Sequence, residues 1–98
     1  MDSEYTHVDF VKCDGNKNII IKTNKFCDID DLRYYTNFFY RNENGKAEYI
    51  KVTGCKKLNS DCTKFRLILK DSLMPGIKYT AYNDQKYFIC YFEFEYQE

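Results

Sequence analysis

The sequence predicts an all-β protein: a single domain over residues 1–98 that folds as an antiparallel β-sandwich of about seven strands, with a small barrel as the alternative. Three observations predict this class. Short apolar runs alternate with a period of two, turn residues separate these runs, and 18% of the residues are aromatic. Aromatic rings fit a pleated surface and lose rotamer freedom in a helix, so residue type and period agree.

The stretch from Lys78 to Tyr96 is the strongest strand signal. It is interrupted by the turn-forming pair Asn83-Asp84, which indicates a hairpin. From Lys86 onward, one face of the second strand is apolar and consists of Phe88, Cys90, Phe92, Phe94 and Tyr96. The opposite face consists of Tyr87, Ile89, Tyr91, Glu93 and Glu95. Three phenylalanines on one face favour burial, so we expect the other strands to cover them.

The N-terminal residues predict a second hairpin. Residues 5–12 and 19–25 have the pattern of strands, and Asp14-Gly15 between them tolerates the positive φ of a tight turn. Alternation places Thr6, Val8 and Phe10 on one face of the first strand, with His7, Asp9 and Val11 on the other. Residues 27–32 then form a predicted turn, in which Asp28 could cap a single helical turn.

Residues 33–41 fit two structures. A helix beginning at Ile29 would place Ile29, Leu32, Tyr35 and Phe39 roughly on one face. Against a helix, most of the segment is Tyr, Phe or Thr, and it leads into Asn44-Gly45, a strong hairpin signal. We interpret 33–41 as a strand.

The remaining segments alternate between strands and turns. Residues 47–53 read as a strand, 54–63 as a polar loop, 65–70 as a strand, and 71–76 as a turn that contains the one proline, Pro75.

Leu73 to Tyr79 resembles the corner that precedes the sixth strand of fibronectin type III domains, with the pattern L-x-P-G-x-x-Y. The resemblance covers seven residues, and the chain lacks the tryptophan usual in that family. It implies an immunoglobulin-like sandwich in which Tyr79 is buried and its hydroxyl bonds to nearby backbone.

Composition argues against several function classes. The formal net charge is +0, with 15 basic and 15 acidic residues, so no overall field attracts the chain to nucleic acid or to an anionic membrane. No apolar run is long enough to span a bilayer. The first ten residues have neither a basic end nor an apolar stretch, so we expect no signal peptide and a cytoplasmic location.

Catalytic and metal-binding patterns are weak. The one histidine, His7, falls on the predicted solvent face, and no nucleophile or phosphate-binding glycine motif accompanies it. The five cysteines include no C-x-x-C pair, which disfavours zinc. Asp14 begins an EF-hand-like run that lacks the glycine and the final glutamate. We expect no enzyme activity, no cofactor and mainly reduced thiols, with Cys55 and Cys62 as the favoured pair if a disulfide forms.

Tyrosine content favours protein recognition, because tyrosine gives a large contact area at low entropic cost. The candidate interface residues are Tyr87, Ile89, Tyr91 and Glu93, with Tyr34 and Tyr40 as additions. The long, apolar last strand could also pair two copies of the chain at a sheet edge, giving a homodimer. Rings beside Lys and Arg are typical of single-strand nucleic-acid binding, but Glu93 and Glu95 would repel phosphate.

We therefore predict a non-enzymatic domain that binds another protein. Lysine greatly outnumbers arginine, and Asn, Ile, Tyr and Phe are abundant, which is the residue usage of AT-rich genomes. With the small size and no leader expected, this usage favours a phage or viral accessory protein that inhibits or adapts a host protein in the host cytoplasm. A self-assembling structural subunit of the virion type is the first alternative, and single-stranded nucleic-acid binding is the second.

Overall fold

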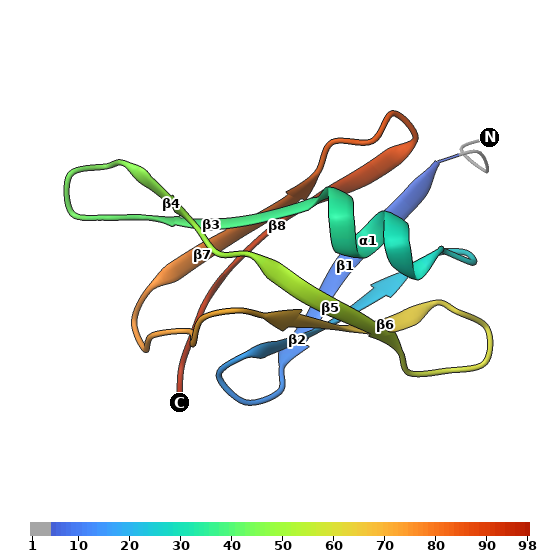
Figure 1. Cartoon of the computed structure of the whole chain (residues 1–98), viewed down its shortest axis with the longest axis horizontal. Helices are drawn as coiled ribbons and strands as arrows, with labels where there is room; N and C mark the ends of the chain where they lie inside the picture. The colour runs from blue at the N-terminus through green and yellow to red at the C-terminus, as the bar shows by residue number, and fades with distance from the viewer. Residues whose placement is uncertain (1–4) are drawn as a thin grey trace.

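The computed structural model describes residues 5–98, so part of the segment in which we expect no signal peptide lies outside the described residues. These described residues form eight strands and one short helix, which follow one another in sequence (Figure 1). Their bounds are β1 Thr6–Cys13, β2 Asn18–Thr23, α1 Ile29–Tyr35, β3 Thr36–Arg41, β4 Ala47–Tyr49, β5 Val52–Lys57, β6 Lys64–Leu69, β7 Lys78–Asn83 and β8 Phe88–Glu95. The all-β prediction is confirmed.

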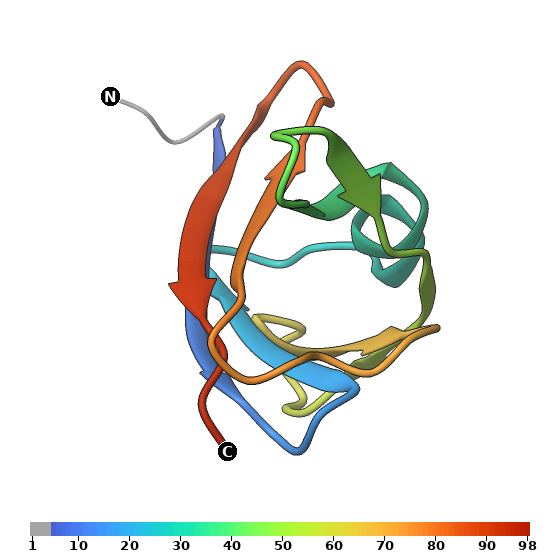
Figure 2. The ribbon, with the colours of Figure 1, turned by 90° about the vertical axis from the view of Figure 1, so that its left-hand side faces the viewer.

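The strands form one mixed sheet in the order β4-β3-β7-β8-β1-β2-β6-β5. All neighbouring pairs are antiparallel except β1 and β8, which are parallel. The sheet curls into a half-barrel around the core (Figure 2). Because β8 lies between β7 and β1, it is not an edge strand, and our suggestion that the last strand pairs copies at a sheet edge is wrong.

A short connection joins the two halves of this half-barrel. The backbone N–H of Ile50 donates to Phe38 on β3 at 2.8 Å, and the carbonyl of Lys51 accepts from Lys70 next to β6 at 2.9 Å. The chain turns at these two residues from β4 into β5. The predicted single strand 47–53 is therefore two strands in different parts of the sheet, a break compatible with the small-barrel alternative.

The alternating pattern of the last strand is confirmed. Cys90, Phe92 and Tyr96 are buried, and Phe94 is half-buried and stacks on Phe10 with a centroid distance of 4.5 Å. The opposite residues of β8 are exposed. Thr6 and Val8 of β1 also point inward, as predicted, so β1 and β8 bury the same side of the sheet.

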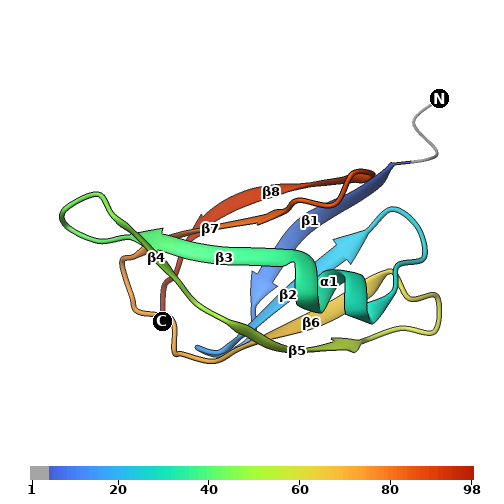
Figure 3. The ribbon, with the colours of Figure 1, turned by 45° about the horizontal axis from the view of Figure 1, so that its top comes forward.

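The interpretation of 33–41 as one strand is wrong in its first part. The side chain of Asp28 accepts a hydrogen bond from the Asp30 N–H and caps α1, whose one buried residue is Leu32. The helix ends where Thr36 takes an extended conformation and begins β3. Figure 3 shows α1 beside β3 and β5. A single buried leucine is enough to anchor a seven-residue helix that the Tyr-rich composition disfavours.

The predicted polar loop 54–63 is also shorter than expected. Strand β5 continues to Lys57 and pairs with β6, with Cys55 opposite Leu67 and buried. Lys56 and Lys57 are both exposed although they belong to this edge strand, so polar residues do not mark its end.

The corner at Tyr79 has the expected geometry. The Tyr79 side chain is fully buried, and its hydroxyl oxygen accepts a hydrogen bond from the Met74 N–H at 2.8 Å. Its ring stacks on Phe38 with a centroid distance of 5.4 Å. The prediction that Tyr79 is a buried corner tyrosine is confirmed.

Candidate protein-binding face

The outward-pointing residues of β4, β3, β7 and β8 form a continuous face. Strand register places Phe39 between Tyr49 and Thr80, and Thr80 opposite Glu93. Two residues further along β7, Tyr82 lies opposite Tyr91 of β8. Since alternate residues share one side of a sheet, these side chains cover the same surface. We name the following residues the aromatic face: Phe39, Tyr49, Tyr82, Tyr87, Ile89 and Tyr91.

Large parts of this face are open to solvent. Tyr91 is 65% exposed, Tyr49 61%, Ile89 48% and Tyr87 46%. Phe39 contacts the rings of Tyr49 and Tyr82, with centroid distances of 5.3 Å and 6.2 Å. Exposed apolar residues scattered one by one are normal on a protein surface, but rings in contact across three strands make a patch.

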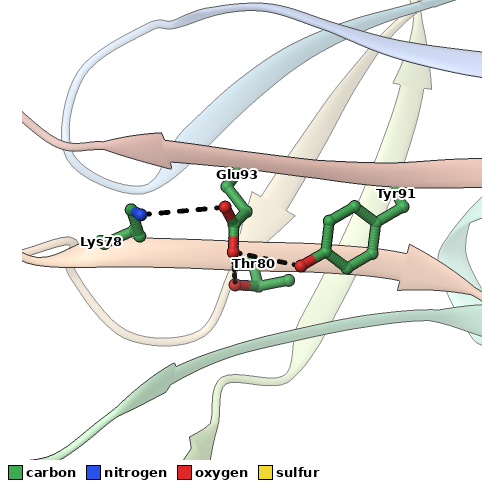
Figure 4. Close-up of polar contacts among 4 residues, drawn as sticks. All are labelled: Lys78, Thr80, Tyr91 and Glu93. Carbon is green, nitrogen blue, oxygen red and sulfur yellow. Dashed lines mark hydrogen bonds and ion pairs between the residues drawn. The ribbon is translucent and has the colours of Figure 1, made fainter.

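A carboxylate lies within this patch. Glu93 accepts hydrogen bonds from the Tyr91 hydroxyl at 3.1 Å and from the Thr80 hydroxyl at 3.5 Å, and its other oxygen is 3.8 Å from Lys78 Nζ (Figure 4). Thr80 is buried beneath these side chains. The bonds hold the Tyr91 ring in a defined position, so this ring is organised before any partner arrives.

Two tyrosine hydroxyls of the face resist ionisation. The hydrogen bond to Glu93 raises the pKa of Tyr91, with smaller contributions from burial and from the charge of Glu93, while Arg41 lowers it. The pKa of Tyr82 is raised mainly by a hydrogen bond with Tyr49. Both groups therefore remain neutral hydrogen-bonding side chains at physiological pH.

Two grooves adjoin these rings. One, of about 400 Å³, has Phe39, Tyr91, Thr80 and Glu93 along it, with Arg41 and Lys78 at its margin. The guanidinium of Arg41 lies 5.5 Å from the centre of the Phe39 ring. The second groove, of about 340 Å³, runs between α1 and β4 and is lined by Tyr34 and Tyr49 among others. The surface thus combines apolar rings with charges of both signs.

The structure brings together four of the six predicted interface residues. Ile89, Tyr91 and Glu93 lie on the outer side of β8, and Tyr87 directly precedes this strand; all four are exposed, as their alternation indicates. Tyr34 belongs to α1 rather than to a strand, is 65% exposed, and adjoins the face through the groove that it shares with Tyr49.

Tyr40 does not join this group. It is half-buried on the inner side of β3, and its ring meets that of Tyr79 edge to face at 5.5 Å. Sequence reasoning missed Phe39, Tyr49 and Tyr82. The hairpin signal at Asn44-Gly45 could have suggested that Phe39 and Tyr49 lie on neighbouring strands, although it does not give their register.

The histidine, the cysteines and the possible metal ligands are dispersed over the described residues. His7 is half-buried on β1, where its backbone N–H donates to Asn24 Oδ1 at 2.8 Å. Across residues 5–98, no three His, Cys, Asp or Glu side chains are placed to hold a metal ion together. No helix within the same residues has the length and apolar character needed to cross a membrane. All five cysteines are free thiols.

Comparisons with known proteins reveal a shared fold. No protein-family model matches the chain, and no curated protein matches its sequence. The structure of the S-layer protein rSbsC(31-844) matches 95% of the chain with a TM-score of 0.78 at 16% sequence identity. The N-terminal part of the bacterial S-layer protein SbsC matches 97% with a TM-score of 0.76 at 16% identity. The chain spans 14% and 24% of those two proteins. At this identity, the likeness shows the fold alone.

Proposed function

We propose that this chain is a non-enzymatic domain that binds another protein through its aromatic face. The observation that supports this function best is the set of exposed and half-buried rings that share the outer side of β4, β3, β7 and β8, with Tyr91 held in place by Glu93. Tyrosine is enriched at protein interfaces because its ring is large and rigid and its hydroxyl remains able to hydrogen-bond.

We further propose that the half-barrel is an immunoglobulin-like sandwich. Strands β5, β6, β2 and β1 would form one layer, and β4, β3, β7 and β8 the other, with β1 pairing across the two. This strand order follows that of immunoglobulin domains, and the Tyr79 corner has its counterpart at the same place in that fold. In this architecture the aromatic face is the outer side of one layer.

A protein partner explains the face better than a nucleic acid does. Single-strand binding surfaces combine stacking rings with a positive groove. Here Glu93 is located between Thr80 and Tyr91, and Glu95 lies opposite Lys78. Carboxylates at these positions repel phosphates, whereas a mixture of rings and both charge signs suits a protein surface.

More specifically, we propose that the chain is a phage or viral protein. It would inhibit or adapt a host protein in the host cytoplasm. The support for this proposal is residue usage, which favours an AT-rich genome. The aromatic face is a surface on which such a host protein could dock.

A self-assembling structural subunit is the second candidate, and the fold likeness to S-layer proteins favours it. The two edges of the sheet argue against assembly by strand pairing. The edge strand β4 has only three residues, and the edge strand β5 carries Lys56 and Lys57, both exposed. Short strands and lysines are features that prevent edge-to-edge pairing. Assembly would therefore have to use a face of the sheet.

Affinity capture from host-cell lysate, divided into nuclease-treated and untreated halves, tests these alternatives. We expect one stoichiometric protein in both halves with wild type, and its loss with Tyr91→Ala. Phe26→Ala is the matched control, since Phe26 is 69% exposed but lies outside the aromatic face. Recovery that disappears with nuclease would overturn the proposal in favour of nucleic acid, and sedimentation as large assemblies would overturn it in favour of a structural subunit.

A further inference from the structure

Two cysteines from distant parts of the chain meet at one point of the fold. The backbone N–H of Cys27, just before α1, donates to the carbonyl of Cys62, in the loop between β5 and β6, at 3.0 Å. Because each Cα atom lies within two bonds of the N or O atom that it carries, this hydrogen bond keeps the two Cα atoms within about 7 Å, close to the roughly 4.4–6.8 Å that disulfides span. The two residues also line one surface groove of about 350 Å³.

The loop that carries Cys62 is held in place by its own hydrogen bonds. The side-chain oxygen of Asn59 accepts from the N–H groups of Thr63 and Lys64 at 3.0 Å and 3.2 Å. Cys62 itself has a φ of 55°, the one positive φ of a non-glycine residue among residues 5–98. This left-handed conformation costs about 1–2 kcal/mol for an ordinary L residue. The loop therefore holds Cys62 against Cys27 in a conformation that a cysteine does not adopt by preference.

We propose that Cys27 and Cys62 form a redox-sensitive disulfide that joins the β5–β6 loop to the segment before α1. The proposal is independent of the binding function, because neither cysteine belongs to the aromatic face. It replaces our favoured pairing of Cys55 with Cys62. Cys55 lies on β5 opposite Leu67 and is not among the residues that line the groove shared by Cys27 and Cys62.

The chemistry is thiol–disulfide exchange with a small disulfide such as oxidised glutathione. Cys62 is the more exposed of the two thiols, so its thiolate attacks one sulfur of the oxidant, forms a mixed disulfide and releases one small thiol. Cys27 then loses its proton, and its sulfur attacks Cys62 Sγ and displaces the second small thiol. Two electrons pass from the protein to the oxidant, whose disulfide becomes two thiols.

Burial makes the second step the slow one. Burial, together with the charges of Asp31, Asp28 and Cys62, raises the pKa of Cys27 to about 11, against a lowering by the hydrogen bond with the Asp28 backbone. The thiolate is the attacking species, so closure of the disulfide should accelerate as the pH rises from neutral toward 9.

Tryptic mapping of the intact chain tests the pairing, because each cysteine falls in a different peptide. The folded protein is equilibrated with mixtures of oxidised and reduced glutathione, remaining thiols are blocked with N-ethylmaleimide, and the digest is analysed by mass spectrometry. We expect residues 26–33 linked to residues 58–64. A link from either peptide to residues 52–56, which contain Cys55, would overturn the proposal, as would five thiols that all remain open to blocking after full equilibration.

Thermal unfolding provides the second measurement. Oxidation should raise the melting temperature by roughly 15–30 °C, because a disulfide that closes a loop of this length restricts the unfolded chain. Cys62→Ser should abolish both the linked peptides and this shift. Cys13→Ser, at a half-buried thiol outside the pair, should retain both. A shift that persists in Cys62→Ser would contradict the assignment.

Discussion

Removing one oxygen atom tests how the Tyr79 corner stabilises the fold. Tyr79→Phe keeps the buried ring and its stacking on Phe38, and deletes only the hydroxyl that accepts the Met74 N–H at 2.8 Å. A net protein hydrogen bond contributes about 1 kcal/mol, and leaving its donor unsatisfied in a partly buried position adds to the loss. We expect the free energy of unfolding to fall by about 1–2 kcal/mol.

Urea denaturation followed by circular dichroism measures this change, since the chain contains no tryptophan to report by fluorescence. The midpoint should fall while the slope stays constant, because the surface exposed on unfolding is nearly unchanged. In thermal unfolding the same loss lowers the melting temperature by roughly 5–15 °C for a domain of this size.

Tyr91→Phe is the matched control, because it deletes an exposed hydroxyl that bonds to Glu93 on the surface. We expect it to change stability by less than about 0.5 kcal/mol. A Tyr79→Phe variant as stable as wild type, or a Tyr91→Phe variant that loses as much, would refute the role assigned to the corner.

Three further predictions concern pH, a turn and an ion pair. Burial raises the pKa of Cys55 and Cys90 from 9.0 to about 12, so their contribution to stability is complete below pH 9.0 and is lost as the pH rises toward about 12. Over this pH range the free energy of unfolding should fall by up to about 1.4 kcal/mol per thiol per pH unit. The fall should be less steep in Cys90→Ala, which has one such thiol fewer. Stability that stays level between about pH 8 and 11 would contradict this. Gly45 has a φ of +80° with no neighbour within 4 Å of an added Cβ, so Gly45→Ala should cost about 1 kcal/mol in urea denaturation through backbone strain alone. Gly45→Asn should cost less, because Asn tolerates this conformation, and equal losses would argue against strain. Asp14→Asn removes an ion pair of 2.6 Å between Asp14, whose side chain is 50% exposed, and Arg66, whose side chain is 35% exposed. The free energy of unfolding should fall by less than about 1 kcal/mol, because both charges are partly solvated. A loss that does not shrink in 1 M salt would show that Coulomb attraction is not its cause.

The sequence predicted the strands correctly wherever one face of the strand is buried and the other is exposed to solvent. In β8 every second side chain is apolar, so its period and its burial coincide. The helix α1 was not predictable in the same way. Its anchor is one leucine in the core and its cap is one aspartate, and both fit a turn equally well.

The candidate face was predictable on β8 alone, because the rest depends on register. A two-residue turn at Asn44-Gly45 would place Tyr40 opposite Tyr49. Instead Asn42 Oδ1 accepts from the N–H groups of Asn44 and Lys46, and this wider turn pairs Phe39 with Tyr49. A shift of one residue exchanges the two sides of a strand. Here the shift places Tyr49 opposite Phe39 on the outer side of the sheet, while Tyr40 lies opposite Tyr79 on the inner side.

Site-specific photocrosslinking is the most direct test of the claim that the aromatic face binds a protein. A photoreactive phenylalanine analogue replaces Tyr91 in one variant and Phe26 in another, and both are irradiated in lysate of the host cell. Both positions are exposed rings, so accessibility alone cannot distinguish them. We predict one discrete adduct from position 91 and none of that mass from position 26. The same adduct from position 26 alone, or equally from both positions, would contradict the assignment of the binding surface.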